Sequence, residues 1–281
     1  MQLKQALSQA VADLASQNVP SPRMNAELLL MFSLGCDRAY LFAHPERELS
    51  AGESSRYDAA LAERARGVPA QYITGHQEFW GMDLIVSPTV LIPRPETEHV
   101  IETALGLLPA PGAGIRIVDV GTGAGAIALA LAREFPKAEI HATDISSAAL
   151  EIARANAARL ELNNQVQFHN TDLLHGLSGS FDLIASNPPY VGESEEDQVQ
   201  LEVRKFEPRA AVFAGPKGTE VIARLIPQAL EKLRPGGWLV LEVSGTIADQ
   251  VQPLLKDWDE LRVIPDLQGI PRVVRARKPH G

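Results

Sequence analysis

A short segment, Asn187-Pro188-Pro189-Tyr190, combines residue types that suit chemistry on a planar nitrogen, and it follows an apolar run over 181–186. The side-chain oxygen of Asn187 and the backbone carbonyl of Pro188 can each accept one N–H, which engages both protons of an NH₂ group. Pro189 holds that carbonyl rigidly because its φ is fixed, and Tyr190 can pack against the flat face of the group. The segment therefore indicates methylation of an amide or exocyclic amine nitrogen, with a proline-rich turn as the alternative.

A glycine-rich loop precedes this segment in the chain, at the end of an apolar run over 115–120. It reads Asp119-Val120-Gly121-Thr122-Gly123-Ala124-Gly125-Ala126 and opens a predicted helix. Glycines in such a loop let the backbone turn sharply and approach a ligand closely. Gly121, Gly123 and Ala126 also satisfy the dinucleotide pattern G-x-G-x-x-G/A, which by itself is a weak signal with a tight turn as the alternative.

Two acidic residues end the next two predicted strands. Asp144 can accept hydrogen bonds from two ribose hydroxyls, and Asp172 can take the amino group of an adenine. The structural alternatives are polar strand ends or, for Asp144, a helix cap that Ser146 could equally provide. Together with the glycine loop, the two acids predict a nucleoside site without identifying the nucleoside.

The elements that must position these residues alternate between strand and helix from Ile115 onward. Strands are predicted at 115–120, 139–143, 166–170, 181–186 and 238–243, with weaker ones near 261–264 and 272–276, and helices at 125–134, 147–161, 219–234 and 246–257. This alternation is typical of an α/β fold with a mostly parallel sheet covered on both faces. The short last connection favours an antiparallel pair at the end.

The first seventy residues read instead as a small helical bundle. Apolar residues recur at helical spacing over 3–14. A second helix is predicted from Pro22 to Gly35 with Ser21 as its N-cap, and a third over 53–66. A hairpin is predicted at 78–86. We therefore expect a helical domain over 1–70, a hairpin and connector over 71–95, and an α/β domain over 96–281.

Composition limits the class of protein. The chain is 45% hydrophobic and 22% charged, as in an average soluble globular protein, and its net charge is −9. The lack of a basic segment counts against direct nucleic-acid binding. No apolar run is long enough to span a bilayer, and Lys4 and Asp13 interrupt the first helix, so we expect no membrane segment, no signal peptide and a cytoplasmic protein. A single cysteine and scattered histidines predict no metal site.

The motifs together identify a resemblance that covers nearly the whole chain. The sequence resembles the release-factor glutamine methyltransferases (the HemK/PrmC family) in Gln71–Gly75, Phe79–Gly81, Leu91–Glu98, the 119–125 loop, Asn187–Tyr190, Pro235–Gly237 with Leu241-Glu242, and Asp266–Arg272. The run Ile92-Pro93-Arg94-Pro95-Glu96-Thr97 is the most specific of these motifs. The family pattern continues Leu-Glu with Ile-Gly or His-Gly, whereas this chain reads Glu242-Val243-Ser244-Gly245.

The resemblance implies a seven-stranded, Rossmann-like fold that uses S-adenosylmethionine, and an N-terminal helical domain that helps to hold a peptide-chain release factor. The reaction it implies is methylation of the glutamine side-chain amide in the Gly-Gly-Gln motif of that factor, a step in translation termination. By position, the donor would contact Asp119, Gly121, Thr122, Gly123, Ala124, Gly125, Asp144, Asp172, Leu173 and Asn187. Asn187, Pro188, Pro189 and Tyr190 would bind the substrate amide, with Asn187, Pro188 and Tyr190 as catalytic residues. Arg94 and Thr97 lie in a connector that either closes over the donor or joins the domains.

Three other functions are compatible with parts of the sequence. A DNA adenine-N6 or cytosine-N4 methyltransferase uses the same tetrapeptide, but it must hold a duplex, which the acidic balance disfavours. A nicotinamide-dependent dehydrogenase would explain the glycine loop and Asp144, but not Asp172 or Asn187–Tyr190. A non-enzymatic nucleotide sensor is the third, and turnover would eliminate it.

Overall fold

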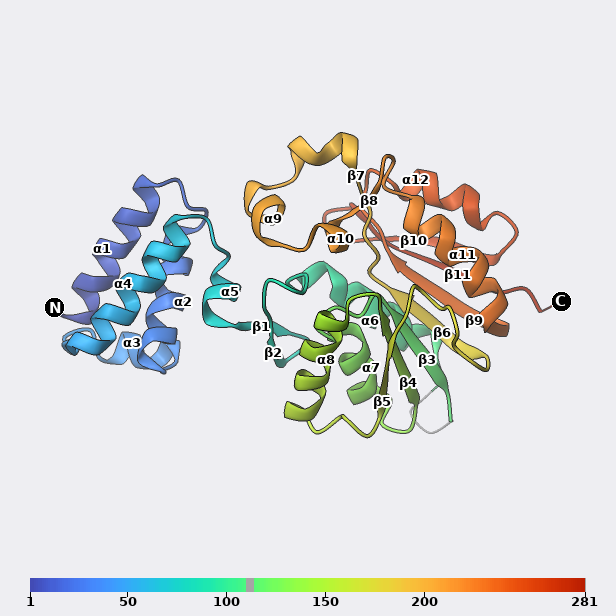
Figure 1. The fold of residues 1–281 in the computed structure, drawn as a ribbon, viewed down its shortest axis with the longest axis horizontal. Coiled ribbons are helices and arrows are strands. Elements are labelled where there is room, and N and C mark those ends of the chain that lie inside the picture. Colours follow the sequence, from blue (N-terminus) through green and yellow to red (C-terminus); the bar gives the residue numbers. More distant parts are fainter. Residues whose placement is uncertain (110–113, 281) are drawn as a thin grey trace. The chain divides into compact units, whose positions relative to one another are not determined.

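Two compact units make up the chain, Met1–His76 and Gln77–Gly281. The computed structural model describes residues 1–109 and 114–280 (Figure 1). No helix in these residues is long and apolar enough to cross a membrane.

The first unit is helical. Its helices are α1 (Leu3–Ser16), α2 (Pro22–Leu34), α3 (Arg38–Ala43), α4 (Ala51–Ala65) and α5 (Ala70–Thr74). The apolar residues of α1, α2 and α4 share one core, in which the buried Tyr57 hydroxyl donates to the carbonyl of Ala26 at 3.0 Å. The three helices expected from periodicity are present, whereas α3 and α5 were not predicted. Ser21 precedes α2 but does not cap it, because its φ of +48° is left-handed and its side chain makes no capping hydrogen bond.

The second unit is built on a sheet of seven strands in the order β10-β11-β9-β6-β3-β4-β5. The strands are β3 (Arg116–Val120), β4 (Glu139–Asp144), β5 (Val166–Asn170), β6 (Phe181–Ser186), β9 (Leu233–Glu242), β10 (Asp259–Pro265) and β11 (Pro271–Arg277). β3 pairs in parallel with β4 and β6, and β6 pairs in parallel with β9. β11 runs antiparallel to both β9 and β10, as the short last connection predicted.

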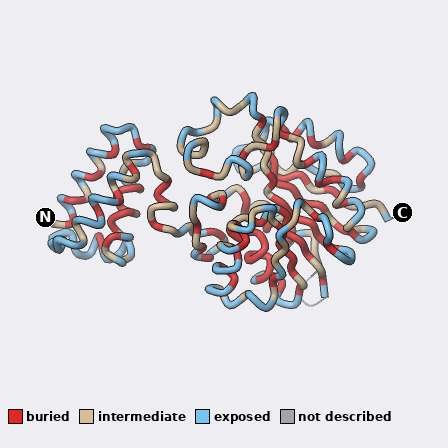
Figure 2. The backbone as a smooth tube through the Cα atoms, in the orientation of Figure 1, coloured by how far each residue is buried: buried red, intermediate tan, exposed pale blue. Residues whose placement is uncertain are grey.

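Helices cover both faces of this sheet, as Figure 1 shows. One face packs against α6 (Glu98–Leu107), α7 (Ala126–Glu134) and α8 (Ser147–Arg159), and the other against α11 (Glu220–Lys232) and α12 (Ala248–Val251). The central strands are therefore buried on both sides (Figure 2), which explains their continuous apolar sequences. This α/β architecture confirms the fold class expected from the sequence.

Shorter elements connect and border this core. They are β1 (His76–Phe79), β2 (Met82–Ile85), η1 (Pro95–Thr97), β7 (Val191–Gly192), η2 (Glu193–Gln198), α9 (Leu201–Phe206), α10 (Arg209–Val212), β8 (Phe213–Gly215) and η3 (Gln252–Leu255). β1 and β2 form the predicted hairpin, and β7 pairs with β8. The helix predicted over 246–257 is in fact the short α12 followed by η3. Pro253 lies in η3, and a proline has no N–H for continuing α-helical hydrogen bonds.

Candidate active site

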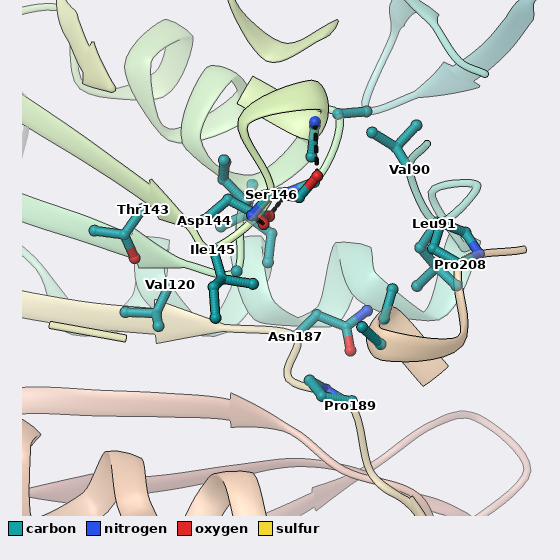
Figure 3. A pocket seen from close by; sticks show the side chains of 18 of the residues that line it. Val90, Leu91, Val120, Thr143, Asp144, Ile145, Ser146, Asn187, Pro189 and Pro208 are labelled. Atoms are coloured by element: carbon teal, nitrogen blue, oxygen red, sulfur yellow. Dashed lines mark hydrogen bonds between the residues drawn. The ribbon is translucent and has the colours of Figure 1, made fainter. Parts of the chain in front are cut away.

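A cavity of about 390 Å³ lies at the carboxyl ends of β3, β4 and β6. This is the edge of an open α/β sheet where ligands bind, and the volume falls within the roughly 300–1,000 Å³ typical of small-molecule sites. Figure 3 shows Asp144 and Asn187, from the ends of β4 and β6, on different sides of the cavity. The sequence-predicted residues that line it are Gly121, Thr122, Gly123, Ala124, Asp144, Asp172, Leu173, Asn187 and Pro189.

The glycine loop forms one wall. Gly121 and Gly123 have φ of +73° and +55°, and a Cβ built on either one would meet no protein atom within 4 Å. Both residues therefore meet two needs, a left-handed backbone and open space for a ligand beside it. The amides of Gly121 and Thr122 donate to the carbonyl of Thr143 at 2.8 and 2.9 Å, which fixes the loop to the end of β4.

Asp119 lies beneath this loop, fully buried, and does not line the cavity. One of its carboxylate oxygens, Oδ2, accepts from the Thr122 hydroxyl at 2.6 Å and from the Ala128 amide at 3.1 Å. Burial raises the pKa of this carboxyl to about 7, against the lowering effect of these two hydrogen bonds. Asp119 thus joins the loop to the start of α7. Gly125, at the N-cap of α7, also does not line the cavity.

Asp144 is oriented by backbone amides on both sides. Its Oδ2 accepts from the Gly123 amide at 2.9 Å and its Oδ1 from the Ser146 amide at 2.8 Å. Each carboxylate oxygen has further lone pairs, so the pair can still accept from two adjacent hydroxyls. The Ser146 side chain caps α8, accepting from the Ala149 amide at 3.2 Å, so Asp144 is not the side chain that caps this helix.

Ile145 was missed by the sequence reasoning. It lines the cavity beside Asp144, yet it is 68% exposed, an unusual position for a large apolar side chain. Its position directly after an acidic strand end is the sequence signal that could have identified it.

Asp172 and Leu173 line the cavity beyond the end of β5. Asp172 forms an ion pair with Arg224 from α11, a second lining residue that the sequence did not predict. Leu173 has a φ of +53°. A left-handed backbone at a non-glycine residue costs free energy and is concentrated at functional sites.

Asn187 points its amide at the connector between β2 and α6. Its Nδ2 donates to the hydroxyl of Thr97 at 3.1 Å, and both residues line the cavity. Because the NH₂ end faces Thr97, Oδ1 is the end available to accept an N–H from another molecule. Thr97, whose role the sequence left open, thus lies in direct contact with the predicted catalytic amide.

Pro188 is buried and, like Tyr190, does not line the cavity, whereas Pro189 does. The Tyr190 hydroxyl donates to Oε1 of Glu242 at 3.3 Å. Burial raises the pKa of Tyr190, and the carboxyl of Glu242 raises it further. The ring is therefore a neutral hydrogen-bond donor fixed against the end of β9.

The connector also closes one side of the cavity. Thr89, Val90, Leu91 and Pro93 line it, as do Pro208, Ala210 and Ala211, and Figure 3 shows Leu91 beside Pro208. Arg94 forms an ion pair with Glu207, whose side chain is 1% exposed, and the Ile92 amide donates to the same carboxylate at 3.1 Å. This carboxylate therefore holds the connector against the 207–211 segment, a contact between residues more than a hundred positions apart that no local pattern signals.

Two protein-family models match parts of this chain. Residues 5–75 match the family model of the PrmC N-terminal domain, and residues 103–206 match the methyltransferase small domain. The chain is 57% identical over 281 residues to a release factor glutamine methyltransferase of Koribacter versatilis, covering 99% of both chains. It is 42% identical over 280 residues to one of Moorella thermoacetica, covering 98% of both.

Solved structures show the same fold at low sequence identity. One is a 16S rRNA N2 G1207 methyltransferase of T. thermophilus in complex with AdoMet and guanosine. It has a TM-score of 0.54 and 20% identity, and the match covers 72% of this chain and 49% of that one.

Proposed function

Because the chain belongs to the release factor glutamine methyltransferase family, we propose that it methylates a glutamine side-chain amide of peptide-chain release factors. The methyl group comes from S-adenosylmethionine, and the acceptor is N5 of the glutamine in the Gly-Gly-Gln motif. The observation that carries this proposal is the orientation of Asn187, whose amide is turned so that its oxygen can accept an N–H at the cavity.

The residues of the cavity fit S-adenosylmethionine. The empty space beside Gly121 and Gly123 suits close approach of a ligand to the backbone. Asp144 presents oriented carboxylate oxygens for a pair of ribose hydroxyls. Ile145 offers an apolar surface beside them for a flat base. When bound, S-adenosylmethionine supplies a methyl group activated by its positively charged sulfur.

The protein's own contribution is positioning. Asn187 Oδ1 and the Pro188 carbonyl accept the two N–H groups of the substrate amide, which aims its nitrogen and enriches it in electron density. Pro189 limits movement of that carbonyl, and Tyr190 holds the segment against β9. A nucleophile held at about 3 Å and in line with the bond it attacks needs no strong base, because most of the barrier reduction comes from orientation. The amide proton leaves during or after transfer, when its acidity has risen.

Several further assignments belong to the same proposal. The helical domain of residues 1–70 helps to hold the release factor, residues 71–95 connect it to the methyltransferase domain at 96–281, and the protein acts in translation termination in the cytoplasm. The partner is a protein, with no direct nucleic-acid contact. The DNA methyltransferase alternative has no support from the relatives, which are release factor glutamine methyltransferases.

The test is transfer of a labelled methyl group. The chain is incubated with methyl-labelled S-adenosylmethionine and a release factor, beside the same factor with its Gly-Gly-Gln glutamine changed to alanine. We expect label on the first factor and none on the second. Label on DNA in a parallel reaction, with none on either factor, would contradict the proposal.

A further inference from the structure

A buried carboxylate lies behind the Asn187–Tyr190 segment, and the proposed function gives it no part in orienting Asn187. Glu242 is the last residue of β9 and is 2% exposed. One oxygen, Oε1, accepts from the Tyr190 hydroxyl, while Oε2 is buried without a hydrogen-bond partner among the described residues. Burying such a group costs free energy unless its interactions compensate, so its presence here needs an explanation.

Thr97 links this carboxylate to Asn187. Thr97 is 3% exposed, and its hydroxyl accepts from Asn187 Nδ2. Its side chain also interacts with the Glu242 carboxyl, because it lowers the pKa of that group. A hydroxyl has a single proton to donate. An ionised carboxylate can only accept, so the Thr97 proton goes to Glu242 and only the lone pairs of Thr97 face Asn187.

The direction in which the Thr97 hydroxyl donates decides which end of the Asn187 amide faces the substrate. Lone pairs on Thr97 attract the NH₂ end, so the oxygen is turned away from Thr97. If the Thr97 proton pointed at Asn187 instead, the amide would gain by rotating half a turn. It would then present NH₂ to a substrate NH₂, and two donors cannot pair.

We propose that Glu242, acting through Thr97, is a positioning residue that fixes the Asn187 side-chain amide with its oxygen toward the substrate. The inference rests on the proposed function and adds to it a determinant of amide recognition outside the cavity wall. Tyr190 serves the same carboxylate, so Glu242 joins both side chains that flank the two prolines.

The charges around Glu242 are consistent with this role. Burial raises the pKa of its carboxyl to about 7, and the nearby Glu96 raises it too. Arg272 and the hydroxyl groups of Thr97 and Tyr190 lower it. Arg272 is itself anchored by Asp266, with Nε and Oδ2 at 2.9 Å. With a pKa of about 7 the carboxyl is mostly ionised at pH 8, and the variants are compared at that pH.

The test compares three variants of the full chain in the labelled-methyl assay. Thr97→Val keeps the shape of the side chain but removes the hydroxyl, and we expect kcat to fall roughly 10–100-fold, somewhat less than direct loss of an oriented polar partner. Thr97→Ser restores the hydroxyl and is expected within about threefold of the unaltered chain. Glu242→Gln adds an N–H donor, so the Thr97 hydroxyl can either donate to the new amide or accept from it. We expect kcat to fall about tenfold.

Two further measurements separate positioning from a structural effect. The KM for the release factor and the Kd for S-adenosylmethionine are expected to stay within about twofold for all three variants, because none of them removes a donor-binding group. Asp182→Asn is the control. Asp182 is also buried, at the far end of β6 from Asn187, where it accepts from the Arg116 amide at 2.8 Å. The Asp182→Asn substitution is expected to lower the melting temperature without lowering kcat.

Normal kcat in Thr97→Val, equal losses in Thr97→Val and Thr97→Ser, or an effect confined to S-adenosylmethionine binding would each overturn the inference. If the unaltered chain transfers no label to a release factor, the proposed function itself fails, and the inference with it.

Discussion

At the scale of single residues, the two ends of the Asn187 amide have different tasks. Nδ2 is held by Thr97 at 3.1 Å, and Oδ1 is left to accept an N–H of the substrate. Asn187→Ala removes this acceptor, and we expect kcat to fall roughly 10²–10³-fold, as when one oriented polar partner is lost from other enzymes. Steady-state transfer of labelled methyl to a release factor measures the change. Retention of most of the activity would contradict the role assigned to Asn187.

Substitution of Gly123 tests whether the glycine loop approaches the methyl donor. The Gly123 φ of +55° is unfavourable for alanine, and the new Cβ would occupy open space beside the cavity. We expect Gly123→Ala to weaken S-adenosylmethionine binding by about tenfold, from backbone strain of roughly 1–2 kcal/mol and from lost space. Isothermal titration calorimetry measures the Kd.

Gly106→Ala is the matched control for this glycine. Gly106 lies in α6, and its added Cβ also meets no protein atom within 4 Å. This substitution is expected to leave the Kd unchanged and to raise stability by up to about 1 kcal/mol, because alanine favours a helix. Equal Kd values for the two variants would show that the loop does not approach the donor.

The site could be predicted from the sequence only as far as local motifs reach. Asp144, Gly121 and Asn187 each follow a strand, and parallel strands bring their carboxyl ends to one edge, so their meeting at the cavity was predictable. The contact between Thr97 and Asn187 was not, because it joins residues 90 positions apart through side chains alone. Glu242 belongs to a motif of the family resemblance, but the sequence does not signal its burial or its contact with Tyr190.

At the scale of elements, the connector before α6 depends on one buried carboxylate. Glu207 pairs with Arg94 and accepts from the Ile92 amide. Removing one partner of a buried ion pair costs up to about 3–5 kcal/mol, because the other charge is left unpaired. Arg94 is a third exposed, so we expect Arg94→Ala to lower the free energy of unfolding by a smaller amount, about 1–3 kcal/mol.

A double-mutant cycle measures this coupling. Glu207→Gln keeps an oxygen for the Ile92 amide but carries no charge, so adding it to Arg94→Ala is expected to recover about 1 kcal/mol or more. Urea unfolding of the four proteins gives the coupling free energy. Strictly additive effects would mean that the ion pair does not hold the connector.

Elements with a strong internal pattern were the predictable ones. The strands β3, β4, β5 and β6 and the helices α7, α8 and α11 carry apolar residues at strand or helix spacing, and each was expected within a few residues of its bounds. β7 and β8 are two and three residues long and exist because they pair with each other across 20 intervening positions. Such pairing leaves no local signature, and the same holds for the short α9 and α10.

At the scale of the whole molecule, two buried acids give the stability a pH dependence. Asp119 is the penultimate residue of β3 and Glu242 the last residue of β9, and burial raises the pKa of each carboxyl to about 7. In the unfolded chain both groups titrate near 4. Between these values the folded protein binds more protons than the unfolded chain, so its stability falls as pH rises. The contribution is fully present below pH 4 and is lost as pH passes through 7.

Asp119→Asn should reveal this contribution. Asparagine does not titrate, so the stability of the unaltered chain relative to the variant is expected to fall between pH 5 and pH 8. Each pKa unit corresponds to about 1.4 kcal/mol, and the folded pKa lies about two units above pH 5, so the fall over this range is at most roughly 3 kcal/mol for this residue. Urea unfolding at intervals of one pH unit measures it. Glu242→Gln is expected to show the same direction, and the two changes should add because the residues share no hydrogen-bond partner. A stability difference that is constant with pH would mean that Asp119 is already ionised in the folded protein at pH 5. In that case its hydrogen bonds to Thr122 and Ala128 outweigh the effect of burial.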